Sequence, residues 1–148
     1  MTRAQVVLAF DFGLKRIGIA SGDTLTREPR PRPAAAVGAK GPDWEAIGGA
    51  IRALGPRQLV VGAPYNADGT EGLLMRAARS FASELGQRFA LPVHLVDERF
   101  SSLEASAALK AQRASRERRR RIARADVDSA AAAVILGRFL QGEGEVTS

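Results

Sequence analysis

Residues 6–20, VVLAFDFGLKRIGIA, constrain the fold of this chain more than any other stretch. Two apolar runs on either side of a short turn at 13–16 predict a β-hairpin whose first strand is buried. That strand ends on Asp11, and burying a lone ionised carboxylate is costly unless it is paired or coordinates a metal. Lys15 and Arg16 follow in the turn, as expected if an anionic ligand approaches Asp11. The alternative interpretation is an ordinary turn aspartate beside a solvated basic tip.

Length and composition favour one domain. A chain of 148 residues can bury a real core, and 45% hydrophobic with 26% charged residues is usual for a globular protein. The absence of cysteine excludes disulfides and thiolate metal sites. No leader opens the chain and no apolar run reaches membrane-spanning length, so we expect a cytoplasmic protein with no membrane partner. We expect the domain to occupy residues 1–140 and a flexible tail to occupy 141–148.

Positive charge is concentrated in one segment. Residues 110–124 hold eight basic residues and one acidic residue, a net of +7, whereas the whole chain carries +6. The remainder is therefore close to neutral, at −1. Such runs bind polyanions by displacing counterions from phosphates, which predicts nucleic-acid contacts from Arg118, Arg119, Arg120 and Arg121. The alternative, a solvated loop kept soluble by its charge, is compatible with ordering on nucleic acid.

The order of the expected elements predicts an α/β domain with a mixed sheet flanked by helices. The proline-rich residues 28–33 are expected to be an extended connection, because proline removes backbone donors. After the hairpin we expect strands at 34–37 (at an edge), 58–62 and 93–96, and helices at 44–54 (capped by Asp43), 71–88 (capped by Thr70), 101–112 and 127–140. Ligands of such sheets bind beyond the carboxyl ends of the strands.

Acidic residues follow two expected strands and begin the last expected helix. They are Asp11, the pair Asp97 and Glu98, and Asp128, which lies on one helical stripe with the apolar positions 132, 135 and 139. Clustered carboxylates repel one another unless a cation lies between them, and all-oxygen ligands suit Mg²⁺ or Mn²⁺. Two such ions can promote hydrolysis of a phosphodiester by activating a water and stabilising the leaving oxygen. For Asp126 a helix N-cap is the favoured interpretation.

Other candidates have structural alternatives. Arg99, beside the second acidic pair, is expected either to hold a phosphate or to form an ion pair with Asp97. Asn66 lies in the turn-rich loop 63–69 and is a candidate nucleic-acid contact. For His94, Trp44 and Tyr65 ordinary packing is the favoured interpretation.

Four segments together resemble the YqgF/RuvX family, whose members are similar to the Holliday-junction resolvase RuvC and share its ribonuclease-H-like fold. The segments are DFGLKRIG at 11–18, VGAPYNADGTEG at 61–72, DERFSS at 97–102 and DSAAA at 128–132. The resemblance implies a catalytic, metal-binding triad of Asp11, Glu98 and Asp128. Glu98 is taken over Asp97 from the family, since alternation puts the two on opposite faces and the sequence does not orient the strand. The arginine run at 118–121 and the DxD spacing at 126–128 depart from the family and from RuvC.

The function that the resemblance implies is a nuclease that matures the 5′ end of pre-16S ribosomal RNA in ribosome biogenesis. The alternative is resolution of four-way DNA junctions in recombination, for which a homodimer is expected because two symmetric cuts need two sites. Two other hypotheses stay open. One is a nucleotide-binding module, because the hairpin also resembles the phosphate hairpin of actin-like ATPases. The other is a nucleic-acid-binding protein without catalysis.

Overall fold

The computed structural model describes residues 4–63, 72–97, 124–141 and 145–146. The strands are β1 (Val6–Asp11), β2 (Arg16–Asp23), β3 (Arg30–Gly38), β4 (Gly41–Pro42), β5 (Gln58–Ala63), β6 (Val93–Asp97) and β7 (Glu145–Val146). The helices are α1 (Trp44–Leu54), α2 (Leu73–Phe89) and α4 (Arg124–Leu140). The helix expected at 101–112 and most of the basic segment lie outside the described residues.

The strands form one mixed sheet in the order β4-β3-β2-β1-β5-β6-β7. β1 and β2 are the expected antiparallel hairpin, while β5 runs parallel to both β1 and β6. The short strands β4 and β7 pair antiparallel with β3 and β6 at the two ends of the sheet. The predicted α/β fold with a mixed sheet is confirmed.

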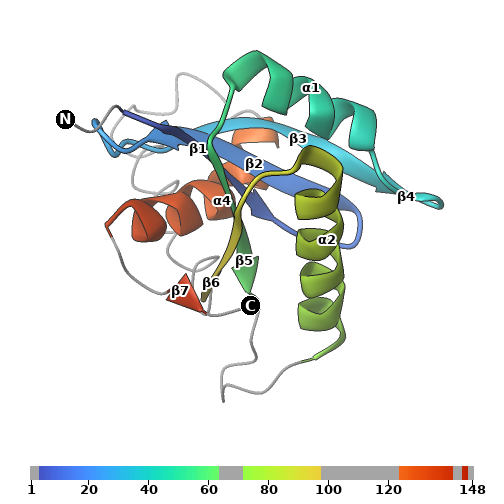
Figure 1. The fold of residues 1–148 in the computed structure, drawn as a ribbon. Helices are drawn as coiled ribbons and strands as arrows, with labels where there is room; N and C mark the ends of the chain where they lie inside the picture. Colours follow the sequence, from blue (N-terminus) through green and yellow to red (C-terminus); the bar gives the residue numbers. More distant parts are fainter. Residues whose placement is uncertain (1–3, 64–71, 98–123, 142–144, 147–148) are drawn as a thin grey trace, which may run out of the picture.

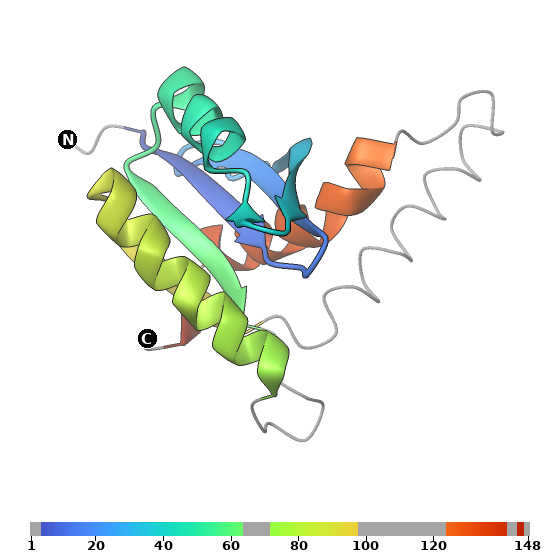
Figure 2. The same ribbon diagram turned by 90° about the vertical axis from the view of Figure 1, so that its right-hand side faces the viewer.

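Helices cover both faces of the sheet, as Figures 1 and 2 show. Because side chains alternate between the faces of a strand, neighbouring residues of β1 enter different cores. Leu8 and Phe10 join a core with α1 and α2, which we call the α2-side core. Val7 and Ala9 join a smaller core with α4, which we call the α4-side core. All four side chains are fully buried.

The ends of α1 follow the sequence signals. The Asp43 carboxylate accepts a hydrogen bond from the backbone N–H of Ala46 at 3.1 Å, which confirms the predicted N-cap. Gly55 ends the helix in the left-handed region at φ 60°. The other two helices begin elsewhere than predicted. Gly72 is the N-cap of α2 in place of Thr70, which lies outside the described residues.

The N-cap interpretation of Asp126 is wrong, because α4 is already helical from residue 124 and Asp126 is its third residue. Helix propensity does not mark this boundary, since Arg124 and Ala125, which precede Asp126 in the helix, are both good helix formers.

β3 is longer than predicted, since it includes Pro31 and Pro33, which had been assigned to an extended connection. Its inner edge pairs with β2 from residue 30 to residue 36. On its outer edge only Val37 and Gly38 pair with β4. A proline on an edge strand removes no required ladder bond, which explains why the strand tolerates both rings.

The expected tail includes a short paired segment. Residues 145 and 146 form β7, opposite Val96 and Leu95 of β6. Pairing with an otherwise exposed edge satisfies backbone groups of β6. Within the residues that the structure describes, no helix is both long and apolar enough to cross a membrane.

Candidate active site

Asp11 is held at the end of β1 by the two aromatic residues that flank it. The Phe10 and Phe12 rings lie 5.7 Å and 5.2 Å from the Phe81 ring of α2, measured between centroids. Both flanking residues belong to the α2-side core. Alternation therefore puts the half-buried Asp11 on the opposite face of the sheet, the face that α4 covers. Burial of two phenylalanines, each worth about 1.5–3 kcal/mol, fixes the strand at this point.

The carboxyl ends of β1, β5 and β6 lie at one edge of the sheet. Phe10 pairs with Val61, and Val61 pairs with Leu95, so Asp11 is at the level of Val96 two strands away. At the usual spacing of about 4.8 Å between strands, the two backbones are roughly 10 Å apart. Asp97, the last residue of β6, is opposite Ala63. The backbone register therefore brings Asp11 and Asp97 to the same edge of the sheet.

The structure also orients β6, which the sequence does not. Leu95 belongs to the α2-side core, whereas Val96 belongs to the α4-side core. Glu98 follows two residues after Val96 in the sequence and lies outside the described residues.

The first turns of α4 lie against β2 and β3. Ala132 and Ile135, four and seven residues after Asp128, are fully buried in the α4-side core, as the helical stripe predicts. Asp128 is part of α4, but the described side chains of this helix begin at Ser129. The Ser129 hydroxyl accepts a hydrogen bond from the Ile19 backbone N–H at 3.0 Å.

Ser129 is a residue to which the sequence reasoning assigned no role. Its side chain is fully buried, and its hydroxyl also donates to the Arg32 carbonyl oxygen at 2.6 Å. The sequence gives only a weak signal that Ser129 has a structural role. A serine that directly follows the candidate acid and precedes four alanines is a polar group on a helix with little else that is polar.

The basic tip of the hairpin follows Asp11. Lys15 and Arg16 are both exposed, as is Leu14, with 71% of its surface accessible. The turn before them is tight, because a Cβ atom on Gly13 would lie 2.6 Å from the Arg16 carbonyl oxygen. The glycine therefore lets the chain reverse directly after the carboxylate.

The remaining predicted contacts are not described. Asn66, Glu98, Arg99 and the run Arg118, Arg119, Arg120 and Arg121 all lie outside the described residues. Of the predicted triad, only the Asp11 side chain is described. Accordingly, the described part of the chain contains no group of three acidic, histidine or cysteine side chains placed to hold a metal ion.

The packing interpretations of His94 and Trp44 agree with the structure. The His94 ring lies 5.1 Å from Phe139 of α4, between centroids. Trp44 stacks on Phe81 at 5.5 Å, and the Arg88 guanidinium lies 4.4 Å from the centre of its ring. Tyr65 lies outside the described residues.

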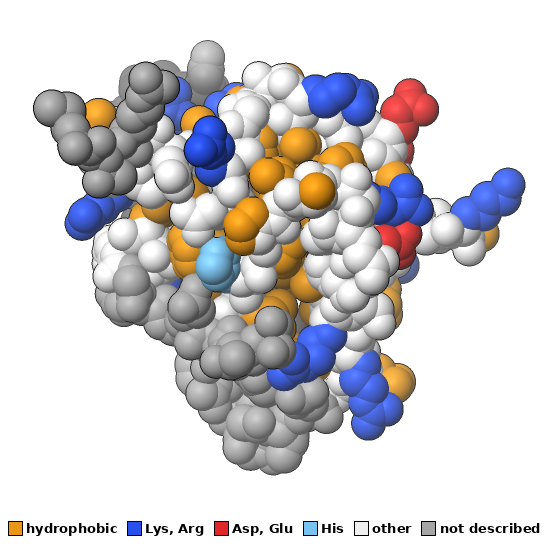
Figure 3. All heavy atoms as spheres, in the orientation of Figure 1, with side chains coloured by type: hydrophobic (Ala, Val, Ile, Leu, Met, Phe, Trp, Pro, Cys, Tyr) orange, Lys and Arg blue, Asp and Glu red, His pale blue; other side chains and the backbone are white. Residues whose placement is uncertain are grey.

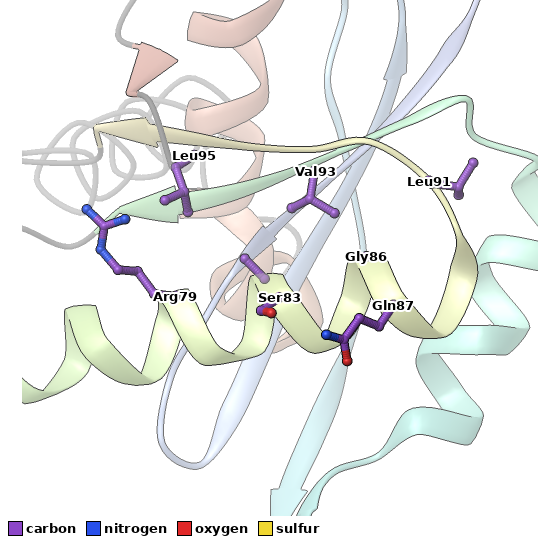
Figure 4. Close-up of a pocket in the computed structure, with 8 residues that line it drawn as sticks. Arg79, Ser83, Gly86, Gln87, Leu91, Val93 and Leu95 are labelled. Carbon is purple, nitrogen blue, oxygen red and sulfur yellow. The ribbon is translucent and has the colours of Figure 1, made fainter.

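A separate groove of about 540 Å³ runs between α2 and β6 on the other face of the sheet. Figure 3 shows hydrophobic side chains along it, beside the pale blue His94, the only histidine of the chain. In Figure 4 its polar side chains come from α2, which also contributes Ala82, and its larger apolar side chains come from β6 and the preceding turn. The labelled lining residues are Arg79, Ser83, Gly86, Gln87, Leu91, Val93 and Leu95. None of them is a predicted site residue.

Comparison with known proteins agrees with this architecture. A family model described as "RuvX: Holliday junction resolvase" matches residues 5–142. A protein of Legionella pneumophila (strain Paris) named "Putative pre-16S rRNA nuclease" is 46% identical over 136 residues, which are 92% of this chain and 95% of the relative. A protein of the same name from Xanthomonas campestris pv. campestris (strain B100) is 43% identical over 141 residues, 95% of this chain and 90% of the relative.

Solved structures share the fold at low sequence identity. RuvC of T. thermophilus in complex with a Holliday junction substrate superposes with a TM-score of 0.57 at 13% identity, covering 96% of this chain and 99% of that one. The yeast mitochondrial Holliday junction resolvase gives a TM-score of 0.50 at 10% identity, covering 91% and 77%. The family match spans nearly the whole chain, and close relatives share more than 40% of its residues. This chain therefore belongs to the RuvX family and has the ribonuclease-H-like fold of the RuvC resolvases.

Proposed function

We propose that this protein is a divalent-metal-dependent endonuclease whose catalytic carboxylates are Asp11, Glu98 and Asp128. Its substrate is the 5′ extension of pre-16S ribosomal RNA, the substrate for which the curated relatives are named. A role in ribosome biogenesis would place it in the cytoplasm. The observation that carries the proposal is the position of Asp11 at the carboxyl edge of the sheet, on the face where α4 begins.

Two geometric observations support Asp11 and Asp128 as catalytic acids. Asp11 lies on the same face of β1 as Val7 and Ala9, which pack against α4. Asp128 directly precedes Ser129, whose hydroxyl is hydrogen-bonded to Ile19. Ile19 is next in the chain to Gly18, which lies opposite Asp11 in the β1–β2 pair. The choice of Glu98 over Asp97 rests on the family resemblance, and Glu98 lies outside the described residues.

The residues fit a hard divalent ion. The chain has no cysteine, and its one histidine packs on Phe139, so the donors at this edge are carboxylate oxygens. When bound, Mg²⁺ or Mn²⁺ supplies a more acidic water and neutralises charge on the phosphodiester. The acids that would hold the ion are Asp11, Glu98 and Asp128. Without a cation, three clustered carboxylates would repel one another.

Basic side chains near Asp11 would hold the substrate. Lys15 and Arg16 are exposed four and five residues after the carboxylate and can contact phosphates that flank the cut. Asn66, Arg99 and the run 118–121 are proposed as further contacts. Each phosphate contact that is lost should reduce the slope of log affinity against log salt by about 0.7–0.9. A Lys15→Ala variant therefore tests one contact directly.

Resolution of four-way DNA junctions is the second candidate, favoured by the description of the family and by the RuvC structures. It requires two active sites, and hence a homodimer, for two symmetric cuts. Cleavage of junctions by a protein that stays monomeric at the assay concentration, measured by light scattering, would argue against paired resolution.

The deciding experiment offers a 5′-extended 16S precursor and a four-way DNA junction side by side to the purified full chain, with Mg²⁺ or Mn²⁺. The proposal expects cleavage of the precursor that Asp11→Asn lowers at least 100-fold, while binding measured in EDTA is retained. The control is Asp23→Asn, a half-buried aspartate at the far end of β2, whose variant should cleave at the wild-type rate. Full activity of Asp11→Asn would refute the mechanism, and cleavage of the junction alone would replace the substrate.

A further inference from the structure

The Ser129 hydroxyl lies within the β2–β3 ladder. Ile19 and Arg32 are register partners in this antiparallel pair, next to a register shift between Ile17 and Ile19. An uninterrupted ladder would join the Ile19 N–H directly to the Arg32 carbonyl. Here the hydroxyl accepts from that N–H at 3.0 Å and donates to that carbonyl at 2.6 Å. A side chain of α4 thus replaces one rung of the sheet.

A hydroxyl is suited to this position because it both donates and accepts. Ser129 is fully buried, so the two backbone groups are shielded from water and need a partner from the protein. Alanine at this position would leave both groups unpaired or force the strands to close up. The bonds bridge 110 and 97 residues of sequence, so they tie the helix to the sheet as well as bridging the strands.

We call the two hydrogen bonds of the Ser129 hydroxyl the clamp. The clamp lies beside positions 11 and 128, the two proposed catalytic positions whose backbone is described. Ser129 directly follows Asp128 in the chain. Ile19 directly follows Gly18, the register partner of Asp11. A shift of the first turns of α4 along the sheet would therefore change the separation between positions 11 and 128.

We infer that Ser129 is a positioning residue of the nuclease site, whose hydroxyl clamp fixes the start of α4 against β2 and so sets the separation of Asp11 and Asp128. This inference rests on the proposed function. Misplacement of catalytic groups by about 1 Å can reduce a rate 100-fold. Removing the clamp is expected to lower kcat about 10- to 100-fold, to leave KM within twofold, and to weaken Mn²⁺ binding at least fivefold.

The test compares wild type, Ser129→Ala, Ser129→Cys and Leu136→Ala. Leu136 is fully buried on the same helix and packs near Gly22, two turns beyond the clamp, so its truncation loosens α4 and leaves the hydroxyl bonds intact. The cysteine variant keeps the volume and offers a weaker donor and acceptor, so it replaces the alanine variant if that one does not fold. All measurements are made below 20 °C, after urea unfolding has shown each variant to be folded.

The expected order of kcat is wild type and Leu136→Ala first, then Ser129→Cys, then Ser129→Ala, and Mn²⁺ affinity measured by calorimetry should follow the same order. Wild-type kcat and Mn²⁺ affinity in the folded Ser129 variants, or an equal loss in Leu136→Ala, would overturn the inference. A wild-type protein that cleaves neither substrate would overturn the proposed function instead. The clamp is then judged on Mn²⁺ binding alone, where equal affinities for wild type and Ser129→Ala would refute it.

Discussion

Substitution of Gly13 by alanine should disturb the hairpin at the point where it presents Asp11. The added Cβ would lie 2.6 Å from the Arg16 carbonyl oxygen, a backbone atom, whereas ordinary contacts begin at 3.4 Å. The turn must therefore open by about 0.8 Å, the difference between the two distances. Relief of such an overlap in a packed region costs roughly 1–3 kcal/mol. Because the displaced segment carries Lys15 and Arg16, substrate affinity should fall together with stability.

Gly38 supplies a matched control for this substitution. It lies at the end of β3, next to the turn into β4, and a Cβ atom there would meet nothing within 4 Å. Urea unfolding should show a loss of about 1–3 kcal/mol for Gly13→Ala and a change of less than about 0.5 kcal/mol for Gly38→Ala. Equal stability and equal kcat/KM in the two variants would refute the tight-turn explanation of the hairpin.

Two further predictions concern positions away from the site. Gly49→Ala in α1 should raise the free energy of unfolding by about 0.5–1 kcal/mol, because a Cβ there meets nothing within 4 Å and alanine is the better helix former; urea denaturation that shows no gain would contradict this. The Asp23 pKa lies below its ordinary value of 3.8, chiefly because the Thr26 backbone N–H donates to the carboxylate. Burial of the carboxylate opposes this shift, and hydrogen bonds from the Leu25 N–H and the Thr26 hydroxyl add to it. The stability that Asp23 contributes should therefore be present above about pH 3.8 and vanish as the pH falls through its folded pKa, so a difference between wild type and Asp23→Ala that stays constant down to pH 2 would refute the assignment.

Local signals predicted most of the secondary structure. The hairpin, the Asp43 cap and the Gly55 stop depend on residues within a few positions of one another, so the sequence carries them directly. The predicted start of α2 differs from the observed start by two residues, because a threonine hydroxyl can cap a helix whereas Gly72, which occupies the cap, makes no side-chain hydrogen bond. The prolines of β3 were misread for a different reason. Whether a strand tolerates proline depends on its place at an edge of the sheet, which no local pattern reveals.

For the candidate site, the sequence by itself determined which acids end the core strands and that the stripe of α4 continues through Asp128. Both follow from the periods of strands and helices, which are properties of the local backbone. Only the tertiary structure decided which face each position takes: Phe10 and Phe12 pack on Phe81 and leave Asp11 to the face of α4, and Val96 gives β6 its orientation. Ser129 likewise acquired its partners, 97 and 110 residues away, only when the helix met the sheet. Such contacts depend on how elements pack, and periodicity within one element carries no information about its neighbour.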